Sequence, residues 1–133
     1  KTFLSNCVAK ELLDTGHSVI YFTAFQLFDI FKRNTFYKAT EADIIAAHQN
    51  IFDCDLLIID DLGTEIPNSF TVSQLFLCLN ERMIRRKSTI ISTNLTLNQV
   101  AQLYSERTFS RLSSSYVMLK LFGDDIRIQK KLR

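Results

Sequence analysis

An uninterrupted apolar run near the middle of the chain constrains the fold more than any other feature. Residues 56–59 (LLII) are all apolar, and the run ends at Asp60 and Asp61. A strand with one face in water alternates apolar and polar residues, so this run predicts a strand buried on both faces. Such strands are typical of parallel sheets covered by helices on both sides.

Helix and strand patterns alternate along the rest of the chain. Apolar residues at helical spacing predict helices over residues 2–15, 24–32, 40–52, 71–86, 97–104 and 106–113. Runs of β-branched and aromatic residues predict strands over residues 18–23, 88–93 and 116–122, in addition to 55–61. This order predicts an α/β fold of three layers, α/β/α, with a mostly parallel sheet in the middle.

Composition excludes several classes of protein. The 133 residues include only three Gly and one Pro, which argues against a flexible linker or a low-complexity segment. No apolar run approaches the roughly 20 residues that cross a bilayer, and no signal peptide is recognisable. We therefore expect a cytoplasmic protein without a membrane partner. Cys7, Cys54 and Cys78 have no metal-ligand spacing and are predicted to be buried free thiols.

The two acids that end the central strand form the strongest chemical motif. Parallel sheets bind ligands at the carboxyl ends of their strands. An apolar strand ending in two carboxylates is the Walker B pattern, in which Asp60 binds Mg²⁺ and Asp61 polarises an attacking water. Taken alone, the pattern fits two exposed acids leading into a turn equally well.

The first two residues add weight to the Walker B interpretation. Lys1 and Thr2 open a predicted helix that is followed by a strand. In a phosphate-binding loop, a Lys in this place reaches the β- and γ-phosphates, and the neighbouring hydroxyl binds Mg²⁺. The chain is therefore predicted to begin at the last two residues of such a loop, lacking the Gly-rich turn and the first strand.

Two later segments supply further candidates. Asn94 follows the strand over residues 88–93, where it either orients an attacking water as sensor 1 or caps the next turn. Arg107 and Arg111 lie four residues apart and share one helix face. One of them is a candidate arginine finger for a neighbouring subunit. The alternative is a solvated basic face that pairs locally with Glu106.

These elements resemble a known family in both order and sequence. The matching segments are LLIIDDLGTE at 56–65, STIISTNLTLNQV at 88–100, ERTFSRL at 106–112 and FGDDIR at 122–127. Together they resemble the AAA+ helicase loaders of the DnaC/DnaI type and their IstB relatives, over essentially the whole chain. The resemblance implies a P-loop NTPase fold of the AAA+/ASCE class, with residues 1–133 forming one ATPase core.

The resemblance also implies a function. It predicts an ATP-hydrolysing DNA replication protein that loads a replicative helicase onto single-stranded DNA, with ATP and Mg²⁺ as cofactors. Lys1 and Thr2 match the end of Walker A, and Thr2 would also bind the Mg²⁺ ion. Asp60 matches the Mg²⁺ carboxylate and Asn94 matches sensor 1. Asp61 stands where many AAA+ proteins carry a longer catalytic Glu, so slow, partner-stimulated hydrolysis is expected.

The remaining roles that the resemblance implies belong to arginines. Arg111 is the first choice for the arginine finger and Arg107 is the second. A finger that reaches the site of a neighbouring subunit requires a homo-oligomer arranged as a ring or spiral. Arg127 matches a late, sensor-2-like arginine that contacts nucleotide. Residues 31–38 combine basic and aromatic side chains and are a candidate contact for single-stranded DNA, with a solvated loop as the alternative.

Other functions share parts of this pattern. An IstB-type transposition helper would have the same fold and chemistry, with a transposase on double-stranded DNA as its partner. A catalytically idle P-loop domain would bind a partner without turnover, although Asp60, Asp61 and Asn94 would then have no use. A receiver domain also carries acids at strand ends, but it needs an acidic pair early in the chain, which is absent here.

Overall fold

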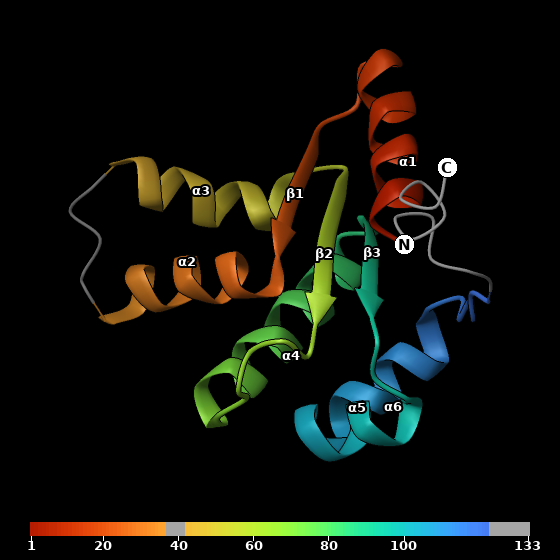
Figure 1. Cartoon of the computed structure of the whole chain (residues 1–133). Coiled ribbons are helices and arrows are strands. Elements are labelled where there is room, and N and C mark those ends of the chain that lie inside the picture. Colours follow the sequence, from red (N-terminus) through yellow and green to blue (C-terminus); the bar gives the residue numbers. More distant parts are fainter. Residues whose placement is uncertain (37–41, 123–133) are drawn as a thin grey trace, which may run out of the picture.

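The computed structural model describes residues 1–36 and 42–122, and it shows a parallel sheet with helices on both faces (Figure 1). The elements are, in chain order, α1 (Thr2–Asp14), β1 (Val19–Thr23), α2 (Ala24–Phe36), α3 (Ala42–Asp53), β2 (Leu56–Leu62), α4 (Ser69–Ile84), β3 (Ser88–Thr93), α5 (Leu97–Tyr104) and α6 (Glu106–Ser115). This order confirms the predicted α/β alternation. Thr40, the predicted start of the third helix, lies outside the described residues.

The three strands lie in the order β1-β2-β3, and both pairs are parallel. Thr23 is opposite Asp60 in the first pair, and Leu62 is opposite Thr93 in the second. An irregularity interrupts the second register between Ile59 and Leu62. All three strands therefore end at one edge of the sheet, beside the amino terminus of the chain (Figure 1).

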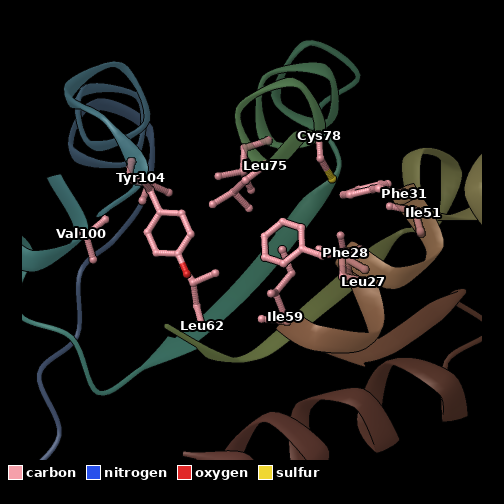
Figure 2. Close-up of a cluster of buried hydrophobic side chains, with 14 of the residues drawn as sticks. Leu27, Phe28, Phe31, Ile51, Ile59, Leu62, Leu75, Cys78, Val100 and Tyr104 are labelled. Carbon is pink, nitrogen blue, oxygen red and sulfur yellow. The ribbon is translucent and has the colours of Figure 1, made fainter. Parts of the chain in front are cut away.

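The main hydrophobic core fills the space between the sheet and α2, α3 and α4, and it extends to α5 (Figure 2). It includes Leu27, Phe28, Phe31, Ile51, Leu57, Ile59, Leu62, Leu75, Leu79, Val100 and Tyr104. Side chains alternate along a strand, so Leu56 and Ile58, which are buried outside this cluster, face the other side of the sheet. The apolar run of β2 is thus buried on both faces, as predicted.

Helix α1 covers that other side of the sheet but buries few of its own side chains there. Its only buried residue is Ser5. Phe3 is 66% exposed and Leu13 is 56% exposed, although both belong to the apolar pattern that indicates this helix. Cys7 is also exposed, so its predicted burial is wrong, whereas Cys54 and Cys78 are buried free thiols as predicted.

A carboxylate ties the segment after α1 to the beginning of β2. The Ser18 N–H donates to Asp55 Oδ2 at 3.0 Å, and the Asp55 N–H donates to Ser18 Oγ at 2.9 Å. Lys87 and His17 lie 3.4 and 3.5 Å from the same carboxylate. The Ser18 backbone hydrogen bond is the main cause that lowers the pKa of Asp55 from 3.8 to about 2.

A buried arginine joins three elements on the core side of the sheet. Arg82 of α4 is fully buried. Its guanidinium donates to the carbonyl oxygens of Ile51 and Ser88, each at 2.7 Å, and to Thr89 Oγ1 at 3.0 Å. These bonds tie the end of α3 and the start of β3 to α4, and they give the buried guanidinium its acceptors.

The predicted strand over residues 116–122 is wrong. These residues follow α6 in irregular conformation, and Val117 and Leu119 are 87% and 80% exposed. A strand forms only when a neighbouring strand accepts its hydrogen bonds, and no described strand pairs with this segment. Residues 123–133, which include Arg127, lie outside the described residues. Within the described ranges, no helix has the length and apolar character needed to cross a bilayer.

Candidate active site at the carboxyl edge of the sheet

The Asp60 carboxylate at the end of β2 receives hydrogen bonds from three different elements. It is 2% exposed and faces the α1 side of the sheet. Thr2 of α1 donates from Oγ1 to Oδ2 at 2.9 Å, and the Tyr21 hydroxyl of β1 donates to the same oxygen. The Ser92 hydroxyl of β3 donates to Oδ1. Both carboxylate oxygens are therefore fixed by neutral donors.

These donors keep Asp60 ionised. Burial alone would raise the pKa of this carboxyl, but the hydrogen bonds from Ser92, Tyr21 and Thr2 together lower the pKa below its ordinary value. In the described part of the chain, no Lys, Arg or His forms an ion pair with Asp60. Within residues 1–36 and 42–122, hydroxyl and backbone hydrogen bonds balance this buried negative charge.

Lys1 meets the end of β3 beside this carboxylate. Its Nζ donates to Asn94 Oδ1 at 2.6 Å and to the Thr93 carbonyl oxygen at 2.6 Å. Lys1 and Thr2 are adjacent at the start of α1, so the two contacts join Asn94 and Asp60 into one network. The structure therefore brings together four residues singled out from the sequence: Lys1, Thr2, Asp60 and Asn94.

Asp61 sits in an unusual backbone conformation next to this network. Its φ is +57°, a left-handed value that Asp adopts more readily than most residues. The irregularity in the β2–β3 register turns Asp61 outward, so it is exposed while Asp60 and Leu62 are buried. Its N–H donates to Ser92 Oγ at 3.1 Å, and its carboxylate makes no hydrogen bond to a described residue.

The loop after β2 is tied to the segment after β3 by three contacts. Thr93 Oγ1 donates to the Leu62 carbonyl oxygen at 2.5 Å, and the buried Tyr104 hydroxyl of α5 donates to Glu65 Oε1. Gly63 has a φ of +103°, and a Cβ at this position would lie 2.6 Å from Leu95 Cδ1. Only glycine fits this close approach. The other Glu65 oxygen, Oε2, is buried with no hydrogen-bond partner among the described residues.

Arg107 and Arg111 lie on α6 in a separate hollow. The Arg107 guanidinium stacks on the Phe76 ring of α4, with its Cζ 4.3 Å from the ring centroid. Phe76, Glu106, Arg107, Ser110, Arg111 and Ser114 line the hollow. Among described residues, neither arginine forms an ion pair or a hydrogen bond with Asp60, Lys1 or Glu106. The structure thus keeps these arginines apart from the strand-end network.

The candidate DNA segment, residues 31–38, is only partly available for contacts. Phe31 is fully buried and its ring contacts His48 and Phe52, so its inclusion was wrong: it cannot stack on a base. Phe36 is 62% exposed and lies 4.9 Å, ring to ring, from Phe70. Residues 37 and 38 lie outside the described residues.

Sequence reasoning missed Tyr21, Glu65 and Tyr104, and it assigned no role to Ser92. Tyr21 lies in an apolar strand pattern, where an aromatic residue normally indicates packing. Its contact with Asp60 depends on the β1–β2 register, which the sequence does not show. Ser92 was a detectable candidate, because it stands within the strand-end segment that contains Asn94.

The residues at the strand ends fit a magnesium ion bound together with phosphates. A hydroxyl binds a cation through a lone pair, so its proton must point elsewhere, and Thr2 directs its proton to Asp60. Oxygen ligands suit Mg²⁺, which usually takes one or two protein oxygens and completes its shell with phosphates and water. In residues 1–36 and 42–122 no three His, Cys, Asp or Glu side chains gather into a metal-ion cluster.

Comparison with known proteins decides the family. The family model described as IstB-like ATP binding protein matches residues 1–133. The chain belongs to this family. The match confirms the predicted resemblance, and it makes this IstB-like protein a member of an ATP-binding family. No curated protein matches the chain in sequence.

Solved structures show the same fold. The crystal structure of the DnaC helicase loader superposes with a TM-score of 0.65 at 20% identity, covering 81% of this chain and 63% of that chain. AMPPCP-bound DnaA from Aquifex aeolicus gives a TM-score of 0.68 at 23% identity, covering 93% of this chain and 38% of that chain. Replication initiator DnaA bound to AMPPCP and single-stranded DNA gives 0.67 at 23% identity, covering 92% and 38%. The IstB-like chain therefore has the predicted P-loop AAA+ fold, and it spans less than two thirds of each of these proteins.

Proposed function

We propose that this chain is the ATP-binding and ATP-hydrolysing core of a DNA replication protein that loads a replicative helicase onto single-stranded DNA. The observation that carries the ATPase part is the strand-end network. It places a buried, ionised carboxylate, which has no cationic partner among the described residues, beside a lysine and an oriented hydroxyl. Membership in an ATP-binding family supports the same chemistry.

Five residues at the strand ends have a role in this proposal. Lys1 neutralises charge on the β- and γ-phosphates, while Asn94, which now accepts its hydrogen bond, orients the attacking water. Thr2 and Asp60 hold Mg²⁺, which offsets the negative charge that develops on the phosphates. Asp61 polarises the water. Its side chain is one methylene shorter than the Glu often found there, so we expect slow turnover that a partner stimulates.

The proposed partners rest on structural similarity to DnaC and DnaA. The DnaC structure is described as a helicase loader, and one DnaA structure contains single-stranded DNA. These likenesses support a helicase and single-stranded DNA as partners, and we expect the protein to act in the cytoplasm. The family description favours a second candidate, a transposition helper of the IstB type. Binding of the full-length protein to a purified replicative helicase, compared with a transposase on double-stranded DNA, separates the two.

The arginines lead us to propose that the active unit is an oligomer with a shared site. Arg111, or Arg107 as second choice, would complete the site of a neighbouring subunit as an arginine finger. Their hollow on α6 is separate from the network around Asp60 in the same chain, which favours action in trans. Arg127 is proposed as an additional nucleotide contact. A head-to-tail interface of this kind generates a ring or a spiral.

One experiment tests both the metal acid and the shared site. In the full-length protein, Asp60→Asn removes the charge that faces Mg²⁺ and should abolish ATP turnover. Arg111→Ala should slow turnover by roughly 10³-fold, the usual effect of losing an arginine finger. Mixing the two inactive variants should restore activity, because some interfaces then pair an intact Asp60 with an intact Arg111.

The control is Asp53→Asn, which makes the same chemical change at an exposed position on α3 and should keep the parent rate. Full turnover in Asp60→Asn would show that Asp60 does not hold the metal. No recovery in the mixture, at concentrations where the subunits associate, would rule out the trans arginine while leaving the role of Asp60 intact.

A further inference from the structure

Tyr21 is the one residue of the strand-end network that no sequence motif includes. It lies on β1 opposite Ile58, two residues before the pair Thr23–Asp60. Side chains two residues apart share a strand face, so Tyr21 and Asp60 lie on the same face of the sheet. From this diagonal position the Tyr21 hydroxyl donates to Asp60 Oδ2.

Packing does not explain the Tyr21 hydroxyl. The side chain is 36% exposed and does not belong to the main core cluster. A phenylalanine would provide the same apolar contact, and an exposed hydroxyl would reach water without strain. The hydroxyl instead bonds to the most deeply buried carboxylate of the site, so its contribution lies in what it does to Asp60.

Tyr21 and Ser92 hold the Asp60 carboxylate from opposite sides. The terminal torsion of an aspartate is broad, so an aspartate at a strand end rotates unless its oxygens are bonded. Ser92 fixes Oδ1 from β3, and Tyr21 fixes Oδ2 from β1. The carboxylate is thereby clamped between the two neighbouring strands, in the orientation that presents Oδ2 to α1.

This orientation in turn sets the direction of the Thr2 hydroxyl. Thr2 donates to the same oxygen, Oδ2, at 2.9 Å. A hydroxyl that gives its proton to a carboxylate keeps its lone pairs for a cation. If Asp60 rotated, Thr2 would lose this acceptor, and its proton would compete with the cation for the same space.

We propose that Tyr21 is a positioning residue of the magnesium site: through its hydrogen bond to Asp60 Oδ2 it aligns the acid and the Thr2 hydroxyl for the metal. The proposal rests on the proposed function, because it concerns the same Mg²⁺ site. Groups that orient metal ligands in this way typically change metal affinity by about 10- to 100-fold when they are removed.

The test is Tyr21→Phe in the full-length protein, which removes a single oxygen. Mn²⁺ serves as the probe, because carboxylate and hydroxyl oxygens accept it in place of Mg²⁺. Free Mn²⁺ is measured by electron paramagnetic resonance in the presence of ADP. We expect the apparent dissociation constant for Mn²⁺ to rise about 10-fold. Affinity for ADP in EDTA, where no metal binds, should stay at the parent value.

Two variants accompany the measurement. Tyr116→Phe removes a hydroxyl from a tyrosine that does not contact Asp60, and it should leave Mn²⁺ affinity unchanged. Ser92→Ala releases the other carboxylate oxygen and should weaken Mn²⁺ binding as Tyr21→Phe does. A loss confined to thermal stability, with unchanged Mn²⁺ affinity in Tyr21→Phe, would overturn the positioning role, and so would tighter Mn²⁺ binding.

Asp60→Asn distinguishes failure of this inference from failure of the proposed function. If Asp60→Asn loses Mn²⁺ binding while Tyr21→Phe keeps it, the inference about Tyr21 is wrong and the metal site stands. If Asp60→Asn itself binds Mn²⁺ with parent affinity, the metal site lies elsewhere, and the proposed function and the inference fall together.

Discussion

The two faces of the sheet are held to their helices by different forces. On one face, α2, α3 and α4 enclose a continuous apolar core (Figure 2). On the other face, α1 leaves Phe3 and Leu13 largely exposed and buries only Ser5. Hydrophobic burial is the main source of stability in a folded domain, so the first face carries most of the free energy of folding.

Helix α1 is held on the sheet by polar contacts near its two ends rather than by an apolar interface. Thr2, at its start, bonds to Asp60 at the end of β2. Ser18, shortly after its end, bonds to Asp55 at the start of the same strand. A helix fixed by its ends keeps its first residues in register with the strand ends. The weakly packed face is therefore the one where the candidate site is positioned.

The largest expected effect compares one phenylalanine from each face. Phe31→Ala removes a fully buried ring from the core and should lower the free energy of unfolding by about 3–5 kcal/mol. Phe3→Ala, on exposed α1, should change it by less than about 0.5 kcal/mol. Urea denaturation followed by circular dichroism measures both. Equal losses would show that α1 is packed as firmly as the core side.

An intermediate effect is expected for the buried arginine of the core side. Arg82→Met keeps the apolar stem but removes a buried guanidinium and its hydrogen bonds to the carbonyl oxygens of Ile51 and Ser88, at a cost of about 1–3 kcal/mol. Arg85→Met is the matched control at the C-cap of the same helix, since Arg85 pairs with Asp53 and Glu81 at the surface. Its loss should cost less than about 1 kcal/mol. The idea of a structural role for Arg82 fails if both variants unfold at the same urea concentration.

The smallest effect belongs to the polar tie after α1 and depends on pH. The pKa of Asp55 is about 2 in the folded chain, below the ordinary 3.8. A depressed pKa contributes stability that is present above the ordinary value and is lost as pH falls through the folded value. The urea midpoint of the parent should therefore exceed that of Asp55→Asn at pH 7, and the gap should shrink between about pH 4 and pH 2. A difference in urea midpoint that stays constant over this range would exclude a stabilising role for the ionised Asp55 carboxylate.

Much of the fold was predictable because its signals are local. The apolar run of residues 56–59 indicates a doubly buried strand, and β3 spans residues 88–93 as predicted. The predicted strand at 116–122 failed because a strand also needs a partner, and the apolar pattern does not say whether one is present. Helix α1 forms as predicted, but helical spacing does not show what covers its apolar residues, and Phe3 and Leu13 are largely exposed.

The candidate site was predictable where chemistry follows a strand end. Lys1, Thr2, Asp60 and Asn94 meet because parallel strands end at a common edge. Tyr21 was not predictable, because its contact with Asp60 depends on a register between two strands that lie 32 residues or more apart in the chain. The roles assigned to the four residues that meet at this edge stay predictions, as do those of Asp61, Arg107, Arg111 and Arg127.

The close approach of Gly63 to Leu95 limits how this protein can diverge. A methyl group at position 63 meets Leu95 at 2.6 Å, and the backbone there has a left-handed φ. Shortening Leu95 would remove apolar packing beside the core, and an alanine at 63 would still carry strain of roughly 1–2 kcal/mol. Each of these substitutions is therefore expected to destabilise the chain by itself. We expect changes in the loop after β2 to be tolerated at the neighbours of Gly63 rather than at Gly63.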